Sequence, residues 1–432
     1  MKNLKTIITL FILVLIASCS KDSDELAEPV VPVSALTISP KTGPKNTIVT
    51  VTGADFSTIA TTNSVTINAI PCVVNSATAT ELKITIPPAV GSGIIKIFVN
   101  GLNRETEKFD FIFTTTVTTI AGNTNGNADG QGALAQFNRP FGIAIDGTKT
   151  LFIADTRNHR IRKISPTGLV TTIAGSTLGF ADGIGDLAKF NFPTHLVRNA
   201  AGDLFVTDKN NHKIRKVSST GQVENYAGST QGFEVGERLS AKFNNPFGIT
   251  NDELGNLYVT DSDNFKIRKV PNSGGVTRVA GNLAGIRDGQ GSAAEFANPE
   301  GIEIDAVGNL YVADDSFSKL IRKISPTGLV TTFAGDVAGF ADGQGAQAKF
   351  SDVTDIAIDR VGNLFVTDKH RIRKITPTGL VTTIAGSDTP GFTDGDASTA
   401  QFNVTAGIAI DQNGNLYVAD SGNNRIRKIT ID

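Results

Sequence analysis

Short runs in which apolar and polar residues alternate, separated by Gly, Pro and Asn, fill the chain from Val117 onward. Runs of this length with a period of two are typical of β-strands. Four of these runs, between residues 141 and 175, form a first set. A Pro and a Gly between the last two runs of this set favour a tight hairpin there. The first set predicts four strands, at residues 141–146, 150–155, 160–165 and 169–175.

The four-strand pattern is repeated six times. An Ala-x-Phe sequence ends at a Phe in each copy, and the first two, Phe137 and Phe190, are 53 positions apart (190 − 137). Repeats of this length are typical of four-stranded units that stack linearly or radially. The six Phe residues are Phe137, Phe190, Phe243, Phe296, Phe350 and Phe402, and an Ile-Arg-Lys run begins at Ile161, Ile214, Ile267, Ile321, Ile372 and Ile426.

The two ends of the repeated region predict how it closes. It begins with a strand of the fourth kind, residues 117–122, and ends with a strand of the third kind, residues 424–432. Pairing these two strands would complete a sixth sheet and remove the exposed edges that an open array must cap. We therefore predict an all-β chain in which residues 117–432 form a closed six-bladed β-propeller.

A different spacing precedes the repeats, in residues 33–114. About six short strands separated by turn residues are typical of a small β-sandwich. Cys72 stands between apolar residues, so we interpret it as a buried structural thiol. The predicted strands are residues 36–39, 48–52, 64–67, 82–86, 94–99 and 109–113.

Both regions resemble known families. The segments ISPKTGPKNTIVTVTGADFS (38–57), LKITIPP (82–88) and GSGIIKIFVNG (91–101) resemble an IPT/TIG immunoglobulin-like domain. NHRIRK at 158–163 and NHKIRK at 211–216 resemble NHL repeats. The first resemblance implies a spacer or platform, and the second implies a propeller that binds ligands on its loop-rich face.

The N-terminal residues predict a secreted lipoprotein. Two Lys precede an apolar run, residues 7–16, that is too short to span a bilayer and is followed by small residues and Cys19. This resembles a bacterial lipobox, which implies a signal peptide (1–18) and lipidation of Cys19; the alternative is an ordinary signal peptide with an incidental Cys. Residues 19–32 predict a flexible tether, and their acidic tract resembles surface-export signals of Bacteroidetes lipoproteins. We expect a protein anchored by lipid in the outer membrane, facing outward or toward the periplasm.

The charged residues favour scaffold roles over nucleic-acid binding. The 432 residues include 40 Lys plus Arg and 42 Asp plus Glu, so no net basic field attracts nucleic acid. An Asp-Gly pair in the long connections, Asp129-Gly130 in the first, predicts a turn or the N-cap of a short helix; the third copy has Val235 in place of the Asp. Opposite charges on adjacent strands predict six Asp–Arg pairs. They are Asp155, Asp208, Asp261, Asp314, Asp368 and Asp420 with Arg162, Arg215, Arg268, Arg322, Arg373 and Arg427.

Two departures from the repeat mark the candidate ligand site. Gly begins the first strand in four copies, whereas His195 and Asp355 occupy that position in the second and fifth. These copies are opposite in a six-bladed ring, so both side chains would approach the central channel; the alternative is that both positions drifted and pack locally. Around them the alignment places Arg139, Phe141, Phe192, Thr194, Phe247, Asn298, Glu300, Asp352 and Thr354.

This mixture of aromatic, acidic and hydrogen-bonding groups suits a polar ligand. We predict a monomeric binding module for an extracellular glycan, peptide or protein, with no nucleic-acid partner. The alternatives are a metal-assisted hydrolase or lyase, similar to lactonase-like propellers with a divalent metal in the channel, and plain adhesion between proteins. No catalytic residue or metal ligand is assigned and no cofactor is predicted, because the other three His (His159, His212, His370) share one repeated loop position.

Overall fold

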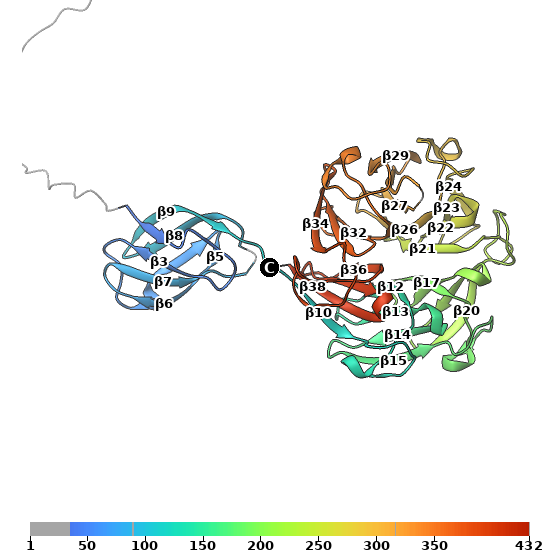
Figure 1. Ribbon diagram of the computed structural model, residues 1–432, viewed down its shortest axis with the longest axis horizontal. Helices are drawn as coiled ribbons and strands as arrows, with labels where there is room; N and C mark the ends of the chain where they lie inside the picture. The colour runs from blue at the N-terminus through green and yellow to red at the C-terminus, as the bar shows by residue number, and fades with distance from the viewer. Residues whose placement is uncertain (1–34, 89, 316, 432) are drawn as a thin grey trace, which may run out of the picture. The chain divides into compact units, whose positions relative to one another are not determined.

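The computed structural model describes residues 35–88, 90–315 and 317–431, so the predicted signal peptide, Cys19 and the whole of the predicted tether lie outside the described residues. Within these ranges the regular elements are β-strands and single turns of 3-10 helix, with no α-helix. No helix there is long and apolar enough to cross a membrane. The chain divides near residue 110 into two compact units (Figure 1).

Two antiparallel sheets form the first unit. Alternate residues of β3 and β7 are buried, as expected for strands with one face on a core. Cys72 is also buried, and burial raises the pKa of its thiol to about 11, in agreement with the structural interpretation. The sheets are β1 (Thr37–Ser39), β3 (Ile48–Thr52), β7 (Glu81–Thr85), β6 (Val73–Ala77); and β2 (Thr42–Gly43), β9 (Leu102–Phe111), β8 (Gly93–Val99), β4 (Ser64–Ile67), β5 (Ile70–Pro71), with the turn η1 (Ala60–Thr62).

Six sheets, numbered here 1 to 6, form the second unit (Figure 1). Each has four antiparallel strands, and all but sheet 3 add a two-residue strand beside the fourth. In order from the first strand they are: sheet 1, β12 (Pro140–Ile145), β13 (Leu151–Asp155), β14 (Arg160–Ile164), β15 (Leu169–Ala174), β11 (Gly130–Gln131); sheet 2, β17 (Pro193–Arg198), β18 (Leu204–Asp208), β19 (Lys213–Val217), β20 (Gln222–Ala227), β16 (Gly183–Ile184); sheet 3, β21 (Pro246–Asn251), β22 (Leu257–Asp261), β23 (Lys266–Val270), β24 (Thr277–Ala280); sheet 4, β26 (Pro299–Ile304), β27 (Leu310–Asp314), β28 (Leu320–Ile324), β29 (Leu329–Ala334), β25 (Gly289–Gln290); sheet 5, β31 (Val353–Ile358), β32 (Leu364–Asp368), β33 (Arg371–Ile375), β34 (Leu380–Gly386), β30 (Gly343–Gln344); sheet 6, β36 (Thr405–Ile410), β37 (Leu416–Asp420), β38 (Arg425–Ile431), β10 (Thr115–Ala121), β35 (Gly395–Asp396).

Short 3-10 turns lie in the connections. One kind follows the two-residue strand: η2 (Gly132–Leu134), η4 (Gly185–Leu187), η7 (Gly291–Ala293) and η8 (Gly345–Gln347). The other kind joins the second strand to the third: η3 (Thr156–Asn158), η5 (Lys209–Asn211), η6 (Ser262–Asn264) and η9 (Ser421–Asn423).

Sheet 6 is built from both ends of the repeated region. β10 pairs with β38, from Thr115 opposite Ile431 to Thr119 opposite Arg427, so the two end strands that the sequence left unpaired pair with each other. First strands of consecutive sheets are in contact throughout the set, including β36 of sheet 6 with β12 of sheet 1.

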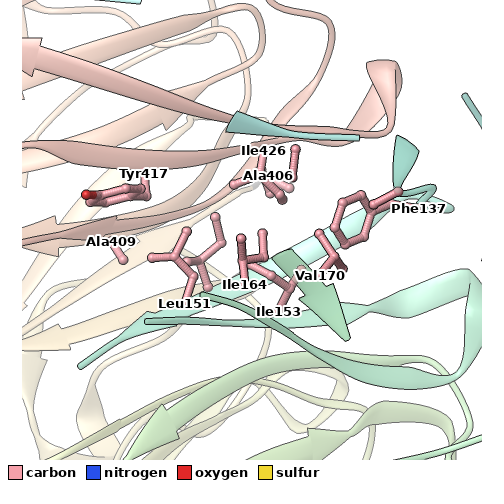
Figure 2. Packing of buried hydrophobic residues seen from close by; sticks show 13 residues of the cluster. Phe137, Leu151, Ile153, Ile164, Val170, Ala406, Ala409, Tyr417 and Ile426 are labelled. Atoms are coloured by element: carbon pink, nitrogen blue, oxygen red, sulfur yellow. The ribbon is translucent and has the colours of Figure 1, made fainter. Parts of the chain in front are cut away.

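Apolar cores lie between neighbouring sheets. Because successive side chains of a strand point to opposite faces, each strand contributes to two cores: in β13, Ile153 packs toward sheet 6 and Ala154 toward sheet 2. Figure 2 shows the core between sheets 6 and 1, with Phe137 among its residues. All six repeat Phe residues are fully buried, as the repetition of an aromatic residue suggests.

A buried arginine in each sheet fastens the long connection to the strands. Arg162 is fully buried, and its guanidinium donates to Asp155 Oδ2 at 2.7 Å and to Asp129 Oδ1 at 2.7 Å. The register places Arg160, not Arg162, opposite Asp155, so the predicted pair forms diagonally. Equivalent Asp–Arg contacts occur in all six sheets at 2.7–3.1 Å.

The Asp129 carboxylate does not have the N-cap role that is one of the two roles predicted for it. Asp129 does not cap the 3-10 turn η2, whose N-cap residue Gln131 makes no side-chain capping bond. Its carboxylate instead accepts from Arg162 and from the backbone N–H of Thr172 at 2.9 Å. In sheet 3 Val235 stands in place of this Asp, and the carbonyl of Glu234 corresponds to that of Ala128, so Arg268 has Asp261 as its one carboxylate among the described residues.

Side-chain acceptors in the turns link consecutive sheets. The Nδ1 atom of His159 accepts from the backbone N–H of Phe192 at 3.3 Å, and Asn424 Oδ1 accepts from that of Arg139 at 2.9 Å. His212 and His370 accept in the same way from Asn245 and Val404, at 3.2 and 3.1 Å. All four donors have left-handed backbone conformations, with φ between 51° and 55°. We call these four bonds the interlock.

We predict that losing the carboxylate of Asp261 destabilises the fold more than losing that of Asp314. Asp261→Asn leaves Arg268 buried with no anionic partner, which costs on the order of 3–5 kcal/mol. Asp314→Asn costs less, because Arg322 keeps Asp288 at 2.9 Å. Urea unfolding of both variants measures the difference, and equal losses would show that the second carboxylate contributes nothing.

We also predict that the three interlock histidines destabilise the fold in acid. Burial lowers the pKa of His159, His212 and His370, and each Nδ1 can accept a bond only while unprotonated. Unfolded histidines titrate near about pH 6.5, so the unfolded chain binds more protons below that value and the free energy of unfolding falls as pH drops. Each bond lost costs about 1 kcal/mol.

The control uses the acceptor that the fourth interlock position already has. Substituting Asn at positions 159, 212 and 370 keeps an acceptor oxygen, as in Asn424, but removes the titration. Urea unfolding at about pH 7.5 and about 5.5 should then show a smaller acid loss in the triple variant than in the parent. The same acid loss in both proteins would rule out the interlock as its source.

Candidate functional site

A cavity of ≈ 460 Å³, called the mouth pocket, lies where the first strands of sheets 1 to 3 begin. Five of the predicted site residues line it: Arg139, Phe141, Phe192, Thr194 and Phe247. The other lining residues come from the turns after the second strands and from sheet 6: Thr156, Arg157, Lys209, Asn210, Val404 and Ser421. Aromatic and aliphatic side chains form much of the lining, with polar groups at defined places, as is typical of small-molecule sites.

Three of the lining residues are held by the interlock. Arg139, Phe192 and Val404 have φ of 51°, 55° and 55°, and each donates its backbone N–H to a turn residue of the preceding sheet. A β-branched residue such as Val404 is rarely left-handed, because its side chain crowds the backbone. Strained backbone of this kind gathers at functional sites, where the surrounding structure compensates for its cost.

His195 and Asp355 meet at the centre of the unit but do not line the mouth pocket. Each is 5% exposed, and His195 Nδ1 lies 3.6 Å from Asp355 Oδ1. They line a second cavity of ≈ 240 Å³, called the channel cavity, whose other lining includes Glu303, Arg198 and aliphatic residues of the first strands. The two departures from Gly therefore approach each other across the centre, deeper than the other candidate residues.

The glycines at the equivalent positions explain why a side chain there is exceptional. A Cβ atom on Gly142 would lie 2.6 Å from Cα of His195, and one on Gly301 would lie 2.6 Å from Cα of Asp355. Real Cβ atoms do not approach backbone so closely, so neighbouring first strands require Gly at these places. In sheets 2 and 5 this position carries a side chain, and the sheets that precede them, 1 and 4, have Gly at the same position.

A septum of three rings lies between the two cavities. The His195 ring lies 5.4 Å from the rings of both Phe141 and Phe247, which contact each other edge to face at 5.1 Å. Phe141 and Phe247 line the mouth pocket, whereas His195 lines the channel cavity. These residues therefore form the floor of the mouth pocket.

Burial disfavours the charged forms of both His195 and Asp355. Burial lowers the pKa of His195 to about 3 and raises the pKa of Asp355 well above its usual range. The imidazole is therefore neutral at neutral pH, and 3.6 Å between Nδ1 and Oδ1 is too long for a hydrogen bond. Asp355 Oδ2 instead accepts from the backbone N–H of Ile408 at 2.9 Å, and His195 Nε2 has no hydrogen-bond partner among the described residues.

Three further predicted residues, Asn298, Glu300 and Asp352, lie with an acidic group of sheets 4 and 5 rather than among the residues lining the mouth pocket. Burial, followed by the charge of Asp315, raises the pKa of Glu300 to about 8, and its Oε1 accepts from Asn298 at 2.9 Å. Asp315 accepts from Lys319 Nζ at 2.6 Å, and Asp352 lies 3.8 Å from the same ammonium. Across residues 35–431 as described, no group of three His, Cys, Asp or Glu side chains could hold a metal ion.

Sequence comparison of the repeats missed Arg157 and Lys209. Lys209 comes directly after the Asp that ends the second strand of sheet 2, and Arg157 comes two residues after the equivalent Asp of sheet 1. The charge at these two repeated positions differs between copies, with Asp315 and Asp263 at the corresponding places in sheets 4 and 3. That variation was the available signal.

Comparisons with known proteins agree with the two-part organisation. A family model of the IPT/TIG domain matches residues 34–119, and a model of the NHL repeat matches residues 402–429. Protein SUPPRESSOR OF QUENCHING 1, chloroplastic, from Arabidopsis thaliana is 31% identical over 319 residues, which cover 68% of this chain and 30% of that protein. The chain thus spans less than a third of that relative.

Solved structures share the fold over nearly the whole chain. A structural genomics protein from Bacteroides thetaiotaomicron has a TM-score of 0.64 at 24% identity and covers 93% of this chain and 99% of its own. An auxiliary nutrient binding protein from the same organism has a TM-score of 0.58 at 21% identity and covers 92% and 98%. The chain therefore contains an IPT/TIG domain at residues 34–119 and an NHL repeat at residues 402–429, and it shares its fold with these solved structures.

Proposed function

We propose that the chain is a lipid-anchored binding protein of the cell envelope that takes an extracellular glycan, peptide or protein at the mouth pocket. The observation that carries this proposal is the pocket itself: ≈ 460 Å³, with an aromatic floor, basic side chains and a wall of left-handed residues. Binding sites gather on loops held by a rigid frame, and this pocket joins strand starts to turns. The similar fold of a Bacteroides auxiliary nutrient binding protein is consistent with such a role.

The architecture that we infer around this site is a closed six-bladed propeller. Its support is the pairing of β10 with β38 and the contact of β36 with β12, which leave no sheet of the set without a neighbour on either side. In the arrangement that we propose, residues 1–18 are removed, Cys19 carries lipid, residues 19–32 are a tether, 33–114 a spacer and 117–432 the propeller.

His195 and Asp355 have a supporting role in this proposal. The His195 ring is part of the septum beneath the pocket, and Asp355 lies beside His195. Neither contacts the ligand, because both line the channel cavity. The alternative of a metal-assisted hydrolase or lyase gains no support from this pair. An imidazole with a pKa of about 3 is a weak general base at neutral pH.

We predict that Phe192→Ala abolishes ligand binding while Asn245→Ala leaves it unchanged. Both residues are left-handed and donate to an interlock histidine, but only Phe192 lines the mouth pocket. Loss of an aromatic contact surface should weaken binding about tenfold or more. Ligands are first identified by thermal shift with a glycan, peptide and metal panel, and a chelator arm detects any metal-dependent turnover. Equal binding by the two variants would place the site elsewhere.

We further predict that Cys19→Ala releases the protein from the membrane. Several acyl chains on one residue anchor stably, whereas the unlipidated chain has no equivalent attachment. Labelling with radioactive palmitate and fractionation of the expressing cells measure the change. Retention of Cys19→Ala in the outer-membrane fraction would contradict lipid anchoring.

A further inference from the structure

The basic side chains of the mouth pocket form no close ion pair within the described ranges, although the charge of Lys209 acts on Glu300 outside the pocket. Arg139, Arg157 and Lys209 form no ion pair with any described residue, and none of the eleven lining residues is acidic. In contrast, Lys319 in the acidic group of sheets 4 and 5 is paired with Asp315, and the buried arginines are paired in every sheet. Since the chain as a whole is nearly neutral, with a formal net charge of −2, this uncompensated group is a local feature. It favours an anionic ligand.

The floor of the same pocket is aromatic. Phe141 and Phe247 meet edge to face, Phe192 stands at the wall, and Lys209 Nζ lies 5.0 Å from the centre of the Phe247 ring. The negative face of an aromatic ring attracts polarised C–H groups such as those on one face of a sugar ring. Asn210, which also lines the pocket, offers an amide to hydroxyl groups.

The septum limits how a ligand can enter. The mouth pocket and the channel cavity share no lining residue, and the rings of His195, Phe141 and Phe247 lie between their linings where sheets 1 to 3 meet. A ligand therefore binds with its end in the pocket, and ≈ 460 Å³ is in the range of sites for small molecules. A terminal ring bearing one carboxylate uses the aromatic floor and the basic group together.

We propose that the mouth pocket binds the terminal uronic-acid residue of an acidic saccharide, its ring on the Phe side chains and its carboxylate paired with the basic group. This assignment rests on the proposed binding function of the pocket and gives it a ligand class. The basic residues Arg157 and Lys209 come from sheets 1 and 2, so the carboxylate is directed toward that side of the pocket.

Calorimetry with the full chain tests the assignment. The probes are galacturonate and glucuronate oligosaccharides, the matching neutral oligosaccharides, an oligoglutamate peptide and inorganic sulfate. We expect the uronates to bind at least about tenfold more tightly than the neutral sugars, since hydrogen bonds to charged groups are the stronger ones. Their affinity should fall about threefold or more between about 50 and about 300 mM NaCl, because salt screens exposed charges.

Matched variants locate the interaction. Arg157→Gln combined with Lys209→Gln should weaken uronate binding about tenfold or more. Arg278→Gln removes an exposed charge from β24, outside the mouth pocket, and should have no effect. An unchanged urea midpoint shows that each variant is folded.

Each other outcome overturns the assignment in a different way. Equal affinity for neutral sugars refutes the charge requirement and leaves the binding function intact. Tighter binding of oligoglutamate identifies a peptide site, and sulfate competing at equal affinity identifies a general anion site. Binding by none of these probes refutes the acidic-saccharide class. If a ligand from the wider panel is then lost with Phe192→Ala, the binding function itself survives.

Discussion

The buried guanidinium in each sheet is the interaction on which the rest of the second unit depends. Burying an arginine is costly unless its donors are satisfied, and here two carboxylates and two backbone carbonyls surround Arg162. One carboxylate belongs to the end of β13 and the other to the long connection before β11. The guanidinium therefore fixes a loop to the sheet, and the Phe137 ring packs against it, with its centroid 5.1 Å from Cζ. Loops held in this way form a rigid frame around the mouth pocket.

The close approach of the first strands is the second constraint. At the Gly positions of the first strands, the backbone of the neighbouring strand occupies the space of a side chain, so the strands approach closely there. The channel cavity of ≈ 240 Å³ remains, lined by His195, Asp355, Arg198 and Glu303 among others. Burial lowers the pKa of His195 and raises that of Asp355, which disfavours the charged form of each. The three aromatic rings with basic side chains beside them lie instead at the mouth pocket, near the start of the first strands.

Repetition made the fold readable from the sequence, and the site was readable only in part. The six copies identified the strands within about one residue, the Asp–Arg pairs and the fully buried Phe residues. They also distinguished His195 and Asp355 from the glycines at the equivalent positions. They did not predict how deep the side chains lie: Thr194 lines the mouth pocket, while the next residue, His195, lines the channel cavity. Alternation along the strand decides this, and a pattern fixes it only when the register is known. The pKa shifts of both groups depend on burial from several sheets at once.

The pairing of β10 with β38 has a consequence for the order of assembly. β38 lies between β37 and β10, and it is the last strand of the region to leave the ribosome. Until then β10, made some three hundred residues earlier, has no partner for its ladder of hydrogen bonds except the short β35. Contacts between such distant segments form slowly, because a long loop must close before they do. Sheets 1 to 5 can therefore form before sheet 6, and β10 exposes an unpaired strand edge until β38 has been made.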